Sequence, residues 1–174
     1  GIEVVARADD GEAEAIVRAR YAAAFDQELR DRIGAAGEEI VAAACRENLS
    51  GLGCAALADQ VQRVSLADDS LGYDIVAPSI NGPARLLEVK TSGRDTPGLF
   101  EFYISRNEYD TGRRQPGTWA LVACDWDGAD AQPIGWCRAA TLATYLPTDG
   151  HGRWMEALVR LPRQLLAPGV PSAV

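Results

Sequence analysis

The hydrophobic pattern of this chain changes near residue 60, and that change restricts the folds that it can adopt. Residues 12–32 and 35–49 are rich in Ala, Glu and Arg, with apolar side chains at helical spacing. From residue 61 onward, short runs rich in β-branched and aromatic residues alternate with turn residues. Two N-terminal helices followed by a strand meander predict an α/β fold with one mixed central β-sheet flanked by helices.

The predicted elements divide the chain into three parts. The strand pattern is found at 61–66, 73–77, 84–90, 99–104, 118–124 and 133–138. The run 154–161 fits either a strand or a helix, and we favour a late strand. Short helices are predicted over 139–145 and from Ser105 to Arg114, where Ser105 and Glu108 have capping-box spacing. The parts are an acidic helical segment (1–32), a main domain (33–165) and an irregular or frayed tail (166–174).

Charge and composition exclude several classes of function. The chain has 174 residues and a net charge of −8, and its N-terminal third is strongly acidic, unlike a nucleic-acid surface. The four cysteines lack zinc-binding spacing, so we expect reduced, mostly buried thiols. The single histidine, His151, lies in a loop-like segment. Because the chain has only this one histidine, catalysis by paired histidines is excluded. Because no membrane span and no signal peptide is recognisable, we expect a cytoplasmic protein.

One predicted strand carries charges that need an explanation. The segment 84-ARLLEVKTSG-93 contains Lys90, the only lysine in a chain with 16 arginines. Because side chains alternate along a strand, Glu88 and Lys90 share one face, whereas Leu87 and Val89 share the other. Buried charges are unfavourable unless they are paired or bound. Lysine, unlike arginine, can change its protonation state in a partly dry site, so we interpret Lys90 as catalytic. A lysine retained by chance is the alternative.

A second carboxylate, Asp74 in 72-GYD-74, comes just before the neighbouring strand. Two carboxylates that converge from adjacent strands would form a hard oxygen site for Mg²⁺ or Mn²⁺. With such a metal, Asp74, Glu88 and Lys90 would form one unit acting on a phosphodiester.

This convergence depends on the loop between the two strands. A two-residue turn at Asn81-Gly82 would turn Asp74 away from Glu88. An odd loop such as 79–83, or a bulge near Asp74, would place both carboxylates on one face. Pro83 cannot donate to a ladder, which favours the longer loop.

Several segments together resemble a known family, the "protein NO VEIN, C-terminal" domain family, within the PD-(D/E)XK restriction-endonuclease-like nuclease superfamily. The resemblance covers roughly residues 33 to 161. The segments, in family order, are 34-GAAGEEIV-41, 63-RVSL-66, 72-GYDIV-76, 88-EVKTSG-93 and 104-ISRNEY-109. The resemblance implies a nuclease-like core that is often joined to helicase or ATPase modules and encoded with restriction or antiphage systems.

The resemblance also assigns roles to individual residues. It implies that Asp74 and Glu88 are metal ligands, that Lys90 is the catalytic lysine, and that Glu38 is the helix carboxylate completing the site. Glu39 is the neighbouring candidate, but the Gly-Glu-x-x-Val pattern favours Glu38. Tyr73 replaces the proline of the superfamily name, as is usual in this family.

Other polar residues are ambiguous from the sequence. Ser105 and Glu108 are interpreted as a structural cap, and Thr91 and Ser92 either hold water or phosphate at the site or form a turn. Arginines near the motif either contact phosphates or are simply solvated. They are Arg85, Arg94, Arg106, Arg113 and Arg114.

These features predict a Mg²⁺-dependent endonuclease acting on DNA, within a restriction or antiphage defence system. The acidic balance predicts weak DNA binding by this chain alone, so that targeting comes from another domain, a partner protein such as a helicase or ATPase, or a homodimer. A catalytically silent module that binds nucleic acid or a partner protein is the main alternative. A metal-dependent phosphoesterase acting on RNA or nucleotides is a third.

Overall fold

The computed structural model of the chain describes residues 10–65, 69–94, 96–150 and 152–174. The chain divides into two units, with the boundary between Arg32 and Ile33. The first helix, α1, extends over Asp10–Gly51, so the prediction of separate helices at 12–32 and 35–49 was wrong. A lone glycine inside a helix destabilises it by only about 1 kcal/mol, which explains why Gly34 does not interrupt α1. His151, assigned to a surface loop, lies outside the described residues.

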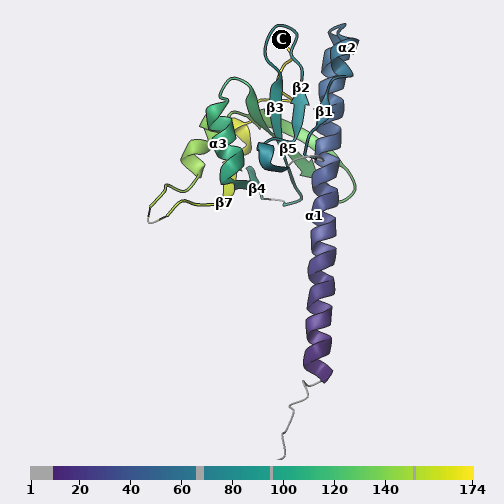
Figure 1. Ribbon diagram of the computed structural model, residues 1–174, viewed down its shortest axis with the longest axis vertical. Coiled ribbons are helices and arrows are strands. Elements are labelled where there is room, and N and C mark those ends of the chain that lie inside the picture. Colours follow the sequence, from purple (N-terminus) through teal and green to yellow (C-terminus); the bar gives the residue numbers. More distant parts are fainter. Residues whose placement is uncertain (1–9, 66–68, 95, 151) are drawn as a thin grey trace, which may run out of the picture. The chain divides into compact units, whose positions relative to one another are not determined.

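The second unit is built on a mixed five-stranded sheet (Figure 1), which confirms the predicted α/β class. The strand order is β1-β2-β3-β5-β6, in which only β3 and β5 are parallel. These strands are β1 (Gln62–Arg63), β2 (Ile75–Ala77), β3 (Arg85–Ser92), β5 (Trp119–Trp126) and β6 (Ala131–Cys137). The predicted first strand at 61–66 is therefore reduced to two residues.

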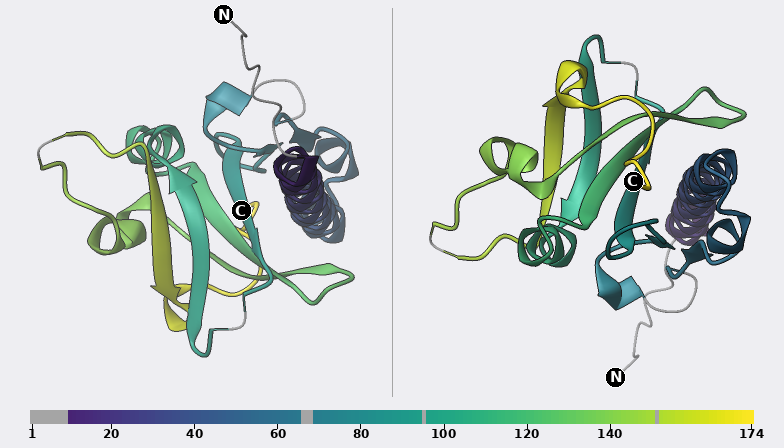
Figure 2. Two further views of the ribbon diagram at one scale, coloured as in Figure 1. Left: turned by 90° about the horizontal axis from the view of Figure 1, so that it is seen from below. Right: turned by 90° about the horizontal axis from the view of Figure 1, so that it is seen from above.

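Two predicted strands do not belong to this sheet. β4 (Leu99–Ser105) pairs with β7 (Glu156–Pro162) in a separate antiparallel sheet, and the two strands lie side by side in Figure 2. The expectation of a single sheet was thus wrong, whereas the interpretation of 154–161 as a strand is confirmed. The partner of a strand depends on the whole fold, and the local sequence does not specify it.

The remaining helices are short. α2 (Ala55–Ala58) precedes β1, and α3 (Arg106–Arg114) follows β4 directly. α4 (Ala139–Leu142) continues into a 3₁₀ turn at Ala143–Tyr145, close to the prediction for 139–145. Further 3₁₀ turns span Asp69–Leu71 and Arg163–Leu165. None of the helices within the described residues is long and apolar enough to cross a membrane.

The hydrophobic core lies on both faces of the five-stranded sheet. Alternate residues of β5 enter different clusters, because successive side chains of a strand point to opposite faces. Ala120, Val122 and Cys124 join the cluster that contains Val41 and Leu49 of α1. The other cluster contains residues of β4, β7 and α4, and β5 adds Trp119, Leu121 and Ala123 to it.

The cysteines and the tail complete the core. Cys45, Cys124 and Cys137 are buried and all four cysteines are free, as predicted. The tail beyond residue 166 is irregular, as predicted, but it is not frayed. Ala173 is fully buried, and its carbonyl accepts a hydrogen bond from the Ile80 amide at 2.8 Å.

Candidate functional site

The register between β2 and β3 brings Asp74 and Glu88 onto one face. Ile75 pairs with Leu87, and the same register continued by one residue places Asp74 opposite Glu88. Seven residues, 78–84, connect Ala77 to Arg85, so the connection is the odd loop and not the two-residue turn. The backbone amide of Val89 donates to Asp74 Oδ2 at 2.7 Å, which fixes the orientation of this carboxylate.

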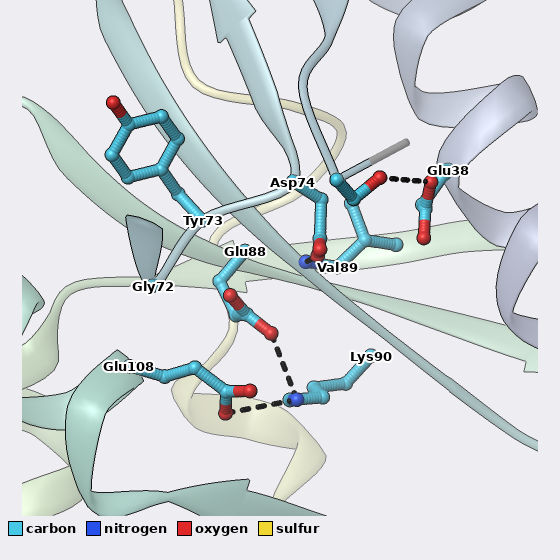
Figure 3. A pocket seen from close by; sticks show the side chains of 9 residues that line it. Glu38, Gly72, Tyr73, Asp74, Glu88, Val89, Lys90 and Glu108 are labelled. Carbon is cyan, nitrogen blue, oxygen red and sulfur yellow. Dashed lines mark hydrogen bonds and ion pairs between the residues drawn. The ribbon is translucent and has the colours of Figure 1, made fainter. Parts of the chain in front are cut away.

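Glu88 and Lys90 form an ion pair on the face of β3 that points away from α1. Leu87 and Val89 occupy the other face, within the cluster packed against α1, as the alternation predicts. Lys90 Nζ lies 2.8 Å from Glu88 Oε1 (Figure 3), and the side chains are only 18% and 4% exposed, respectively. The structure therefore contains the paired, buried charges that the sequence indicated.

A second carboxylate reaches Lys90 from α3. Glu108 Oε2 lies 3.0 Å from Lys90 Nζ, and the same oxygen accepts a hydrogen bond from the Ser105 amide at 2.8 Å. Ser105 Oγ in turn accepts from the Glu108 amide, so the predicted capping box is present. The cap interpretation was correct but incomplete, because Glu108 also belongs to the pocket. The position of the SRNE segment among the family-like motifs was the signal for this second role.

Helix α3 and the first residue of β5 position the loop that carries Asp74. Asn107 Nδ2 donates to the Ser70 carbonyl at 2.8 Å, and the indole of Trp119 donates to the Gly72 carbonyl at 2.9 Å. Gly72 has φ +75°, and a Cβ there would lie 2.6 Å from Thr111 Oγ1. Only glycine fits this close approach without strain, which is why the loop fits tightly against α3 before Asp74.

Glu38 enters the site because α1 approaches β3 closely at Gly37. A Cβ on Gly37 would lie 1.9 Å from Thr91 Oγ1, so only a glycine permits this contact. Glu38 lines the pocket, but its Oε2 accepts hydrogen bonds from Ser65 Oγ at 2.7 Å and from Arg63 Nη2 at 2.8 Å. Arg63 and Ser65 were not among the site residues inferred from the sequence.

The other polar residues considered near the motif do not line this pocket. Glu39 is more exposed, pairs with Arg63 and does not line the pocket. Thr91 packs against Gly37, and Ser92 Oγ accepts from the Arg94 amide in a turn. None of the five arginines considered from the sequence lines this pocket. Arg85, for example, is buried and donates to the Pro78 carbonyl.

These side chains line one pocket of about 270 Å³, which we call the acid pocket. It contains more negative than positive charge, because Lys90 is the only basic side chain that lines it in the described part of the chain. In Figure 3 the carboxylates of Asp74, Glu88 and Glu108 lie around the pocket, while the Tyr73 ring points away from them. The lining residues are Glu38, Ser65, Gly72, Tyr73, Asp74, Glu88, Val89, Lys90 and Glu108.

The excess of negative charge changes the protonation equilibria. Burial raises the pKa of Asp74 to about 6; the Val89 amide and Lys90 oppose this rise, whereas the Glu38 and Glu108 charges add to it. Burial also raises the pKa of Glu88 well above its usual value, and Lys90 offsets this only in part. Lys90 therefore does not fully compensate the negative charge that surrounds Asp74 and Glu88 in the pocket.

The pKa of Lys90 shifts in the direction opposite to the one expected from the sequence. Burial alone would lower the pKa of Lys90, but the Glu88 and Glu108 carboxylates together raise it above its ordinary value. Lys90 is thus an ammonium group at neutral pH. The expectation that it changes its protonation state is corrected, and its role is that of a fixed cation and hydrogen-bond donor.

Asp74 and Glu88 have the donor chemistry for a hard divalent cation. Mg²⁺ is commonly bound through one or two carboxylates, with water and substrate oxygens completing its shell. Asp74, directly before β2, and Glu88, on β3, carry negative charge that Lys90 does not fully compensate, which fits that arrangement. Within the described residues, however, no group of three or more acidic, histidine or cysteine side chains could hold a metal by itself. In this conformation Glu38 Oε2 accepts hydrogen bonds from Arg63 and Ser65.

Comparison with known proteins identifies one family. Residues 37–133 match the family described as "Protein NO VEIN, C-terminal". The match covers more than half of the chain and includes every residue that lines the acid pocket. It is narrower than the resemblance over residues 33 to 161, and β7 lies outside it. No curated protein and no solved structure matches the chain.

Proposed function

The chain belongs to the Protein NO VEIN, C-terminal family, and from this premise and the acid pocket we propose that it is a metal-dependent nuclease hydrolysing DNA phosphodiester bonds. The proposal includes membership of the PD-(D/E)XK superfamily. Support comes from the order of the elements, in which a helix bearing Glu38 precedes Asp74 and then the Glu88-x-Lys90 strand.

One observation carries the proposal: the β2–β3 register aims Asp74, Glu88 and Lys90 into the same pocket. The opposite register would have separated the two carboxylates. Lys90 is held by two carboxylates at 2.8 and 3.0 Å, so its ammonium group is pre-oriented at the pocket. A preorganised charge of this kind stabilises charge that develops during a reaction.

The roles of the side chains follow from their charges. Asp74 and Glu88 would hold the cation, Mg²⁺ or Mn²⁺, which when bound polarises the phosphodiester and lowers the pKa of water. Lys90 donates hydrogen bonds to a phosphate oxygen or to the attacking water and stabilises the added negative charge. In the reaction, the water oxygen forms a bond to phosphorus and releases a proton, the bond to the leaving oxygen breaks, and that oxygen is protonated.

A plasmid cleavage assay tests the proposal. Supercoiled DNA is incubated with the full chain and Mg²⁺ or Mn²⁺, and with the Lys90→Ala and Asp74→Ala variants. Glu156→Gln, which changes an exposed carboxylate of β7, is the matched control. We expect cleavage by the wild type and the control only. Cleavage that survives both pocket substitutions would show a contaminating nuclease and would contradict the proposal.

The metal requirement has a test that does not depend on cleavage. Calorimetric titration with Mn²⁺ should show binding to the wild type and none to Asp74→Ala. Equal binding by both proteins would contradict the assignment of Asp74 as a ligand.

A catalytically silent binding module is the second candidate. It is favoured by the existing contacts, since Glu38 is engaged by Arg63 and Ser65 and Lys90 by two glutamates. For this candidate, the wild type would cleave neither DNA nor RNA with any divalent ion, yet would bind nucleic acid or a partner protein. The RNA arm also tests the phosphoesterase alternative.

The proposed biological setting is a restriction or antiphage system. The net charge of −8 disfavours strong binding of the isolated chain to DNA. We therefore propose that a helicase, ATPase or other targeting module, or a second copy of the chain, delivers the substrate. Tight binding of random duplex DNA by the isolated chain at physiological salt would contradict this point.

A further inference from the structure

A second pocket lies beside α3, and its charge is opposite to that of the acid pocket. It has a volume of about 280 Å³, and we call it the arginine pocket because Arg113 and Arg138 are its only charged lining residues. Its remaining surface is formed by Tyr109, Gly112, Pro116 and the alanines at 139, 140 and 143. No carboxylate lines it, in a chain whose net charge is −8.

Arg138 is held in place by contacts in which no carboxylate of the described residues takes part. Its Nη1 donates to the Trp119 carbonyl at 2.8 Å, and its guanidinium lies 5.0 Å from the centre of the Trp136 ring. Burial lowers the pKa of Arg138, and no carboxylate opposes that effect. A cation that is partly desolvated and paired only with a carbonyl and an aromatic face retains its capacity to bind an anion.

Arg113 supplies the second guanidinium. It lies on the last turn of α3 and 6.0 Å from the centre of the Tyr109 ring. A basic residue at the end of a helix is often explained by the helix dipole alone. That explanation does not extend to Arg138, which comes from the segment between β6 and α4. Two guanidinium groups from separate segments therefore meet at one pocket.

This arrangement differs from that of most other arginines in the described part of the chain. Within the described residues, seven arginines contact acidic side chains: Arg46, Arg63, Arg94, Arg106, Arg153, Arg160 and Arg163. Neither Arg113 nor Arg138 forms an ion pair with a described residue. Arg113 and Arg138 thus bring two guanidinium groups that have no acidic partner among the described residues to one concave surface.

Helix α3 connects the arginine pocket to the acid pocket. Glu108 lines the acid pocket, while Tyr109, Gly112 and Arg113 line the arginine pocket. Residues 108 and 112 are about one helical turn apart, roughly 6 Å along the axis. In Figure 1, α4 lies beside α3 in lighter green. Residues of both helices line the second pocket. A polyanion at one pocket is therefore close to the other.

We propose that the arginine pocket binds a backbone phosphate of the nucleic-acid strand whose cleavage is assigned to the acid pocket. The two guanidinium groups contact the phosphate, and the alanine and proline surface with Tyr109 accommodates the adjoining sugar or base. The inference rests on the proposed function, because it takes the ligand to be the substrate. Phosphate contacts position a nucleic acid without reading its sequence, so this pocket would set the register of the strand at the acid pocket.

The test measures binding and does not require cleavage. A fluorescein-labelled single-stranded oligonucleotide is titrated with the full chain at low salt in EDTA, and affinity is followed by fluorescence anisotropy over a series of salt concentrations. Arg113→Ala and Arg138→Gln each remove one guanidinium. We expect each to weaken binding about tenfold, the usual effect of losing one charged hydrogen bond, and to reduce the salt slope by about 1.

Two further variants keep the test decisive. Ala143→Glu places a negative charge at the exposed rim without altering any arginine contact, and should weaken binding even if Arg138→Gln fails to fold. Arg114→Ala removes the same charge from the same helix outside the pocket, and should have little effect. Unchanged affinity and salt slope in folded Arg113→Ala and Ala143→Glu would overturn the inference, as would an equal loss in Arg114→Ala.

Competition distinguishes the sources of the phosphate. An unlabelled oligonucleotide should displace the probe far better than inorganic phosphate or a mononucleotide at equal phosphate concentration. Pocket-dependent binding of a mononucleotide without pocket-dependent binding of the oligonucleotide would overturn the substrate assignment. If binding depends on the arginines but the wild type never cleaves, the proposed function fails and this inference stands. If the wild type cleaves and the variants bind normally, the proposed function stands and this inference fails.

Discussion

The acid pocket and the arginine pocket lie beside the same helix, but their charges are compensated differently. In the acid pocket, Lys90 contacts two glutamates and Arg63 contacts Glu38, although the carboxylates remain in excess. In the arginine pocket, the guanidinium groups face aromatic rings and a carbonyl only. The charge of the ligand that a pocket favours therefore depends on which of its own charges lack an opposite partner. The acid pocket favours a cation, and the arginine pocket favours an anion.

The largest effect is expected for Lys90→Ala. Loss of one preorganised donor to developing charge should lower kcat about 100- to 1,000-fold. Arg113→Ala, in the other pocket, should instead raise KM and leave kcat nearly unchanged, because the contact proposed for Arg113 is with a non-reacting phosphate. Steady-state cleavage of a labelled oligonucleotide measures both quantities. If Lys90→Ala acted mainly on KM, the division of roles between the pockets would be wrong.

The next effect concerns stability and pH. The pKa of Asp74 is raised from 3.8 to about 6 in the folded protein, so its contribution is fully favourable below about pH 4 and is lost as pH rises through 6. As the pH rises from about 4 through 6, ionisation of Asp74 should lower the free energy of unfolding of the metal-free wild type by up to about 3 kcal/mol. Asp74→Asn should remove most of that loss, as measured by urea denaturation in EDTA.

The arginine pocket provides the contrast for this prediction. Arg138→Gln should show the same change in stability between pH 4 and 8 as the wild type, because arginine does not titrate there. Glu88 also faces Asp74, and because burial raises its pKa as well, it contributes to the same slope. If the free energy of unfolding of the wild type rose between pH 4 and 7 by as much as that of Asp74→Asn, the assignment of a raised pKa to Asp74 would be contradicted.

A smaller effect separates the two roles of Glu108. Glu108→Gln retains a side chain that can complete the capping box but removes one negative charge from Lys90. We expect about a tenfold lower kcat, since the ammonium group is held less firmly, with little loss of stability.

The smallest effect is expected for Ser105→Ala. This change removes the capping hydroxyl and should destabilise the protein by about 1 kcal/mol while leaving kcat unchanged. Thermal unfolding and single-turnover cleavage together measure both variants. Equal losses of activity in Ser105→Ala and Glu108→Gln would show that Glu108 acts only through the helix.

Strand alternation explains why part of the site was predictable. Placing Glu88 and Lys90 on one face requires only the two-residue period of a strand. The position of Asp74 required the loop length, which Pro83 indicated but did not determine. The motif-based choice of Glu38 over Glu39 agrees with the structure, where only Glu38 lines the pocket.

Other features depend on contacts between distant segments. The capping box gave Glu108 a sufficient local explanation, so nothing in the sequence required its contact with Lys90 on another strand. The pairing of β4 with β7 joins strands that are more than 50 residues apart. The burial of Ala173 likewise depends on packing against remote residues of the core and on hydrogen bonds with Ile80 and Asn48. Local patterns identify elements, whereas these tertiary contacts are set by the assembled fold.

The contact between Gly37 and Thr91 has a consequence for comparing related chains. A methyl group at position 37 would be too close to Thr91, with the nearest atom 1.9 Å away, and would force the helix off the strand. Glu38 would then withdraw while every ionisable residue of the motif stayed in the sequence. A homologue could thus keep all its acids and its lysine and still lose the position of Glu38, so the uncharged position preceding Glu38 is the one to inspect first when asking whether a relative keeps the acid pocket.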